Sequence, residues 1–495
     1  MRYARYIGRV GGLAVALGIG AGLAAMPWVA SADCTTVICV NPPHPPPVVH
    51  PLPTSPNISV STNGVQRIDR GTAEADSEGT GSRAIARGDE STAIAYGDHN
   101  TAIANGAGST ATATDGTYNT AKVNGIGSTA TATDGDHNTA TVTGTGSDAL
   151  AGHGSENTAT VTGRGSFATA AGGDNNTATV VGNDFSVASA GLGDNNTATV
   201  TGNQSTATAS FGDNNTATVT GDDSTAEAGG TFLFGETTLG NNNTATVTGD
   251  DSAAFAVNGN HNTSTVTGNQ SFASTGGGDN NTATVDGDDS KSVAGGGDDN
   301  TATVTGDNSE AEATGGSDNT ATVKGEFSTA TAAIGDNNTA TVTGDNSDAL
   351  AGGTVIEGED VVGNNNTATV TGNGSDARAF QGSGNTATVD GKDSRATAGG
   401  GNDNTATVIG THSDASAGIG DGNTATVEGD DSDASAGIGD KNTATVNGDD
   451  SSARAGGTFS FPGTTTLGSN NTATVNGDNL SADAGPGDGN TDTAP

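Results

Sequence analysis

Histidines and serines are the side chains of this sequence best suited to acid–base or nucleophilic chemistry. Three of the seven histidines, His99, His137 and His261, occupy one repeated position directly before an asparagine. Serines such as Ser128 and Ser147 recur just as regularly, and the pattern places no general base beside them. The sequence also contains no phosphate-binding loop of the GxxxxGK[ST] type. We therefore predict a non-enzymatic protein whose histidines lie in solvated turns.

The two cysteines, Cys34 and Cys39, lie close together in the segment CTTVIC. In an oxidising compartment, this spacing favours a short-loop disulfide. A zinc site would need two further ligands, and the nearby His44 and His50 lie among prolines. We predict the disulfide and keep zinc as the alternative.

Aspartates crowd the predicted turns, as in GDDS at 221–224 and GDDN at 297–300. Carboxylate oxygens are ligands that Ca²⁺ prefers. In the calcium-binding coils of repeat-in-toxin proteins the motif is GGxGxDxUx. Here the aspartate directly follows glycine, so the phase of that motif is not reproduced. We expect no resident cofactor, only weak and non-specific binding of Ca²⁺.

Threonines form the most regular pattern of polar side chains. They stand at the first and third positions after almost every repeated asparagine, which predicts two straight files on one sheet. Representative members are Thr139, Thr141, Thr158, Thr160, Thr177, Thr179, Thr197 and Thr199. Such TxT files resemble the ice-binding face of several antifreeze β-solenoids. The alternative is that threonine is simply a polar residue suited to an exposed strand.

A repeat of about 19 residues, N-T-A-T-V-x-G-x-x-S-x-A-x-A-x-G-x-x, positions these side chains. Alanine and valine alternate with threonine, which predicts two short strands and two turns in each unit. One unit cannot bury a core by itself, so successive units must stack. We predict an all-β fold, a two-sided parallel β-solenoid of about twenty coils with a thin Ala/Val core.

Asparagine and glycine are expected at the corners of the coils because both tolerate positive φ. Stacked asparagines should add a ladder of hydrogen bonds along the corner, as in cross-β structures. The predicted ladder includes Asn138, Asn157, Asn176, Asn196 and Asn215.

Composition excludes several other classes of protein. Aromatic residues make up 3% of the chain and glycine contributes 80 residues, too little apolar material for conventional globular cores. The net charge of −41, with only 16 Lys and Arg, opposes binding to nucleic acid or to anionic membranes.

The chain begins with features of an export signal. Arg2, Arg5 and Arg9 precede a small-residue apolar stretch, and residues 30–32 form an A-x-A cleavage site. We assign 1–32 as a signal peptide, with a membrane anchor as the alternative, and predict no transmembrane segment in the mature chain. In style this segment is similar to exported actinobacterial proteins. Residues 33–56, which hold both cysteines and many prolines, are predicted to be an extended spacer.

Further segments interrupt or end the repeat region, 71–490. Insertions near 229–242, 352–365 and 456–470 read as hairpins that either cover the local core or offer knobs to a partner. Residues 57–70 are predicted to form a capping strand. Residues 491–495 form a C-terminal cap, because Asp492 takes the place of an inward alanine. Both caps favour a finite rod.

The string GDNNTATVTG resembles the curlin repeat of bacterial functional amyloids, G-x-x-N-x-A-x-V-x-Q, over most of residues 71–490. Glycines such as Gly144 and Gly163 stand where curlins have glutamine, so the glutamine ladder of the fibre is missing. Residues 90–111 are similar to the β-solenoid heads of trimeric autotransporter adhesins, but the stalk and membrane barrel are not found.

These resemblances imply a secreted or cell-surface protein with a structural or adhesive role. Its expected partner is itself or an extracellular surface or matrix ligand. The alternative function is ice binding through the threonine files.

Overall fold

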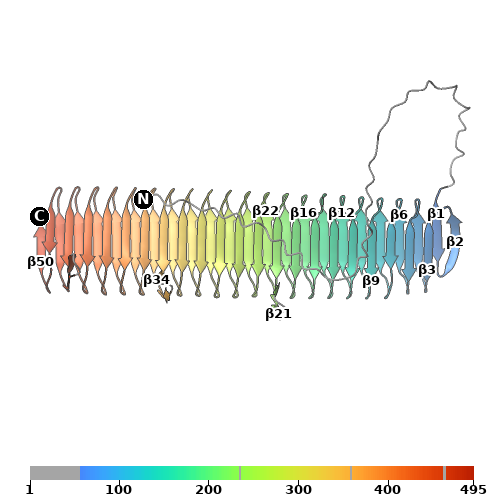
Figure 1. Ribbon diagram of the computed structural model, residues 1–495, viewed down its shortest axis with the longest axis horizontal. Coiled ribbons are helices and arrows are strands. Elements are labelled where there is room, and N and C mark those ends of the chain that lie inside the picture. Colours follow the sequence, from blue (N-terminus) through green and yellow to red (C-terminus); the bar gives the residue numbers. More distant parts are fainter. Residues whose placement is uncertain (1–55, 234–235, 357–358, 461–463) are drawn as a thin grey trace, which may run out of the picture. The chain divides into compact units, whose positions relative to one another are not determined.

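The computed structural model describes residues 56–495 except 234–235, 357–358 and 461–463. Cys34, Cys39, the signal peptide and nearly all of the spacer therefore lie outside the described residues. The described chain is an all-β solenoid of about 21 coils, each of about 19 residues, as the sequence predicts. At about 4.8 Å per strand, the stack is roughly 100 Å long (Figure 1).

Each coil contributes one strand to each of two facing parallel sheets. In a typical coil, β10 (Thr139–Thr143) joins the 23-stranded sheet A, and β11 (Asp148–Gly152) joins sheet B. Sheet A includes β12 (Thr158–Thr162) and β14 (Thr177–Val181), and sheet B includes β13 (Phe167–Ala171) and β15 (Val187–Gly191). Neighbouring strands pair without a register shift, so equivalent residues of successive coils lie in straight files.

The core consists of the inward residues of both sheets. Ala140 and Val142 from sheet A and Ala149 and Ala151 from sheet B are almost completely buried, and their equivalents follow the same pattern along the stack. Alanine loses little apolar surface on burial, so each coil gains little hydrophobic stabilisation. The backbone ladders and the buried polar side chains must therefore supply much of the order.

Three hydroxyl side chains replace inward alanines near the middle of the stack. Ser264 and Thr275 lie 3.0 Å apart through their hydroxyl oxygens, and the hydroxyl of Ser292 donates to the carbonyl of Ala302 at 2.7 Å. All three are fully buried, and each has a hydrogen-bond partner. The core therefore accepts polar residues only where a partner is available.

Residues 57–70 form two strands, whereas the sequence predicted a single capping strand. β1 (Ile58–Thr62) and β2 (Val65–Arg70) are antiparallel, and β1 is also antiparallel to β4 (Arg83–Arg87) of sheet A. Asn63 and Gly64 both have positive φ, as a two-residue hairpin turn requires. The hydroxyl oxygen of the inward Ser59 accepts a hydrogen bond from the amide of Ala75 in β3 (Glu74–Glu78). This bond connects the hairpin to sheet B.

At the C-terminal end, the last strand of sheet A is β50 (Thr491–Ala494), paired with β48 (Thr472–Asn476). Asp492 takes the register of the inward Ala473. Its Oδ2 accepts the amide of Asp483 at 2.7 Å, in β49 (Ser481–Ala484), the last strand of sheet B. Asp492 thus satisfies an amide at the end of sheet B.

The three insertions form separate two-stranded antiparallel sheets (Figure 1). Their strands are β20 (Phe232–Leu233) with β21 (Glu236–Thr237), β34 (Thr354–Ile356) with β35 (Glu359–Val361), and β46 (Thr458–Ser460) with β47 (Thr464–Thr466). In the described residues, none of these strands extends sheet A or sheet B.

Candidate binding face

The repeat asparagines from Asn100 to Asn471 lie inside the corner of each coil and are fully buried. The amide of Asn157 donates to Oδ1 of Asn138 at 3.0 Å, and Nδ2 of Asn157 donates to the carbonyl of Gly173 in the next coil at 2.8 Å. The members Asn176, Asn196 and Asn215 repeat the first contact with their predecessors at 2.9 Å. Each asparagine therefore connects the coil before it to the coil after it.

Positive φ falls on the residue before each of these asparagines. His137, Glu156 and Asn175 have φ values of 62°, 62° and 58°, whereas the repeat asparagine is outside this region. Asparagine does take positive φ at the corner, as Asn175 shows, but at the position before the repeat asparagine. Its side-chain amide, with both a donor and an acceptor, explains its place in the repeat.

A second buried ladder is formed by the repeat serines, whose role the sequence analysis missed. The amide of Ser147 donates to the hydroxyl of Ser128 at 3.2 Å, and the hydroxyl of Ser147 donates to the carbonyl of Gly163 at 3.0 Å. The signal was present in the sequence, since these serines share the 19-residue period of the asparagines. Their burial and partners give them a structural role.

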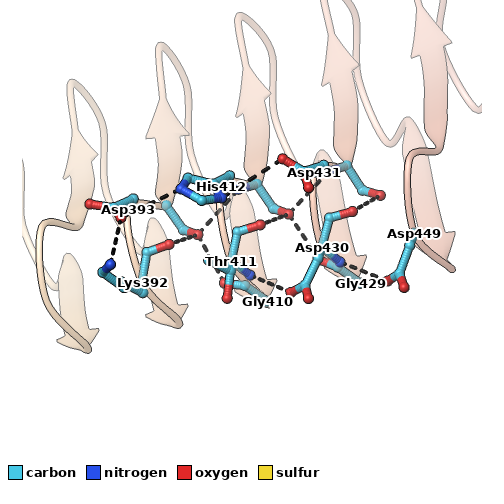
Figure 2. Close-up of polar contacts among 12 residues, drawn as sticks. Lys392, Asp393, Gly410, Thr411, His412, Gly429, Asp430, Asp431 and Asp449 are labelled. Atoms are coloured by element: carbon cyan, nitrogen blue, oxygen red, sulfur yellow. Dashed lines mark hydrogen bonds and ion pairs between the residues drawn. The ribbon is translucent and has the colours of Figure 1, made fainter.

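Aspartates and asparagines form exposed files outside both corners. Figure 2 shows one file, in which the amide of Thr411 donates to Oδ1 of Asp430 at 2.7 Å and the amide of Asp430 donates to Oδ1 of Asp449 at 2.9 Å. His412 lies beside this file, 3.5 Å from Asp393. The carboxylates thus accept hydrogen bonds from backbone amides of the neighbouring coil. Among the described residues, no group of three or more His, Cys, Asp or Glu side chains is placed to hold a metal ion.

Two files of outward residues on sheet A are the most uniform in composition of the described chain. In every sheet A strand from β10 to β50 the first and third residues are threonine and point outward, whereas β6 (Thr101–Asn105) and β8 (Thr120–Asn124) have Ile103 and Lys122 at the third position. We call these two files the threonine face. Thr139, Thr141, Thr158, Thr160, Thr177, Thr179, Thr197 and Thr199 all belong to it and are partly exposed. Within the described residues, no side-chain hydrogen bond engages the hydroxyls of this face.

The outer surface of sheet B has the same strand geometry but a mixed composition. Its outward positions hold residues as different as Phe167, Glu227, Lys291, Arg395 and Asp433. The fifth position of the sheet A strands is also mixed. An exposed strand of this solenoid therefore tolerates many residue types. Strand propensity alone does not account for the uniform threonine face.

Three exposed apolar residues mark the bases of the hairpins. Leu239, Val362 and Leu467 are 65%, 58% and 70% exposed and occupy equivalent positions, each directly before the glycine that closes the hairpin. The bases of the three hairpins also share one hydrogen-bond pattern. In each, a single backbone carbonyl of the preceding coil accepts hydrogen bonds from the amides at both ends of the insertion. In the second hairpin, the amides of Gly353 and Gly363 both donate to Ile334 at 3.0 Å. The hairpins therefore leave apolar side chains in solvent along one corner.

Glu227, in β19 (Thr225–Gly229) of sheet B, is partly buried, and this burial raises its pKa. A carboxyl with a pKa higher in the folded than in the unfolded chain destabilises the fold once it is ionised. Glu227→Gln should therefore raise the melting temperature at neutral pH. The gain should shrink as the pH falls through the pKa of the folded chain. Calorimetry at several pH values would measure this, with the exposed Glu326→Gln as the charge-matched control. An equal gain in the control, or one independent of pH, would contradict the expectation.

No protein-family model matches this chain, and neither a curated protein nor a solved structure matches it. Among the described residues, no helix has the length and apolar character needed to cross a membrane.

Proposed function

We propose that this protein is an exported, non-enzymatic rod with a structural or adhesive role, secreted or displayed at the cell surface. In this proposal, the threonine face is the surface that binds an extracellular matrix or another extended ligand. The observation that carries the proposal is the contrast between the two sheets, since the first and third outward positions are uniform from β10 onward in sheet A and mixed in sheet B.

The chemistry of the face supports a neutral and repetitive ligand. Each threonine offers a hydroxyl that donates and accepts, together with a methyl group. The face carries no formal charge, although the chain as a whole has a net charge of −41. Within each file, successive threonines are spaced at about 4.8 Å, so the face can contact a repetitive surface at many points and weak contacts add up to useful avidity.

Adsorption of the purified protein to extracellular matrix and to neutral polysaccharide surfaces tests the adhesive role. We expect saturable binding that resists high salt, because the contacts involve no charged side chains of the face. Binding that disappears in salt would assign the interaction to the acidic corners, and no binding to any such surface would remove the adhesive role.

Ice binding is the second candidate, and the same observation favours it. A flat file of regularly spaced threonines can hold water molecules in a regular arrangement. Thermal hysteresis and inhibition of ice recrystallisation measure this activity directly. Faceted ice crystals at low protein concentration would support ice as the ligand. Normal ice growth at high protein concentration would exclude it and leave the adhesive role untouched.

A further inference from the structure

Sheet A has an unpaired strand edge at each end of the described chain. At the N-terminal end, β2 pairs only with β1, and at the C-terminal end β50 pairs only with β48. Unpaired edges of this kind are templates for pairing with another chain. The hydrogen-bonding groups of each edge determine what can pair there.

The outer edge at the N-terminal end runs in the direction of the rest of the sheet. β1 is antiparallel to β4, and β2 is antiparallel to β1, so two reversals make β2 parallel to β4 and to the later strands. A hairpin that ended after β1 would expose an antiparallel edge. The second strand therefore restores the direction that a parallel stack needs.

At the C-terminal end of the described chain, β50 has no pairing strand on its onward side. In each coil, the first residue of the sheet A strand donates its amide to the next coil, as Thr472 does to the carbonyl of Asn490 at 2.8 Å. Successive residues of a strand direct their backbone N–H and C=O groups to opposite sides. The amides of Thr491 and Thr493, two residues apart, therefore both point onward. Asp492 closes the end of sheet B and leaves this edge of sheet A open.

The two ends also differ in charge. All six residues of β2 are exposed, and they include Arg67 and Arg70 with a single acidic residue, Asp69. Val65 and Ile68 of the same strand are 47% and 40% exposed. By contrast, residues 478–495 contain four aspartates and no lysine or arginine. Basic residues at one end and acidic residues at the other favour contact between opposite ends of two copies.

We propose that the protein assembles head to tail, with β2 of one copy pairing in parallel with β50 of the next. This contact is heterologous and does not close, so repetition along the axis produces a filament. The hairpin of 57–70, expected from the sequence to stop growth, then acts as the acceptor for the next copy. The junction continues sheet A alone and is weaker than the stack within a copy. The proposal concerns the ends of the rod and goes beyond the adhesive role of the threonine face.

Two variants of the full secreted chain test the junction from opposite sides. Thr493→Pro removes an onward amide of β50 without removing a bond to β48, because proline lacks the N–H group. Arg67→Glu with Arg70→Glu reverses the charge of β2. Arg164→Glu with Lys392→Glu makes the same change in charge at exposed corners of coils inside the stack and serves as the matched control.

Sedimentation velocity and electron microscopy over a range of concentrations provide the readout, with circular dichroism to verify folding. We expect wild type and control to form filaments whose lengths are multiples of one rod. In each junction variant, the concentration for half-assembly should rise at least about tenfold. Single rods at every concentration, filaments unaffected by either junction variant, or purely side-by-side association would overturn the proposal. Surface adsorption should not change in the Arg67→Glu, Arg70→Glu variant, which leaves every member of the threonine face in place, so this variant separates the present test from that of the threonine face.

Discussion

Lysine substitution of Thr388, Thr407 and Thr426 is expected to reduce binding to the protein's extended ligand at least about tenfold. These threonines are third-position members of the threonine face in three successive strands, β38 (Thr386–Asp390), β40 (Thr405–Ile409) and β42 (Thr424–Glu428). A long, strongly hydrated side chain prevents close contact between a flat surface and the neighbouring files. Adsorption isotherms, or ice growth if ice is the ligand, would measure the loss.

The matched control places the same substitutions on the opposite sheet of the same coils. Thr397, Ser416 and Ser435 are the third, outward residues of β39 (Arg395–Gly399), β41 (Asp414–Gly418) and β43 (Asp433–Gly437). Their replacement by lysine changes the net charge equally and should leave binding within about twofold of wild type. Equal losses in the two triple variants would show that the threonine face is not the binding surface.

Removing the side-chain amide of one buried asparagine should destabilise the stack by about 2–6 kcal/mol, because two buried polar groups are orphaned and each costs about 1–3 kcal/mol. Asn300→Ala leaves the amide of Asn319 without its acceptor at 3.0 Å and the carbonyl of Gly316 without its donor at 2.8 Å. Because coils are stabilised by their neighbours, the damage should be greatest in the adjacent coils. Urea denaturation and local amide hydrogen exchange would measure both effects.

Asn281→Ala is the control for this prediction. Oδ1 of Asn281 accepts the amide of Asn300 at 2.9 Å, but Nδ2 of Asn281 has no hydrogen-bond partner in the described chain. This substitution orphans one group instead of two, so its cost should be lower by roughly 1 kcal/mol or more. Equal costs would mean that the bond from Nδ2 to the next coil contributes nothing measurable.

The repeat allowed the coil, its two strands and the inward alanines and valines to be predicted, because a period of two within a period of 19 leaves few other arrangements. The threonine files followed from the same alternation. The uniform composition of the threonine files indicated a binding surface only once the structure was known, because the outward positions of sheet B have the same strand geometry but a mixed composition. Sequence alone could not separate the preference of a strand for threonine from the requirement of a surface.

Other features were missed because one pattern is compatible with two environments. Ser128 and Ser147 have the spacing and polarity of exposed turn residues, and only their partners show that they are buried. The N-terminal hairpin was foreshadowed by Asn63 and Gly64, a pair typical of tight hairpin turns. The direction of its outer strand, β2, depends on the pairing of β1 with β4, a long-range contact that the local sequence does not encode.

The distance between two exposed residues in distant coils tests the central claim that successive coils stack in register. Thr220 ends β18 (Thr216–Thr220) and Thr343 ends β32 (Thr339–Thr343), six strands later in sheet A. Spin labels on Thr220→Cys and Thr343→Cys, with Cys34 and Cys39 replaced by serine, would report this distance in solution. At about 4.8 Å per strand, we predict a narrow distribution near about 29 Å. A broad distribution extending to much longer distances would contradict the stacked solenoid, and with it the threonine face.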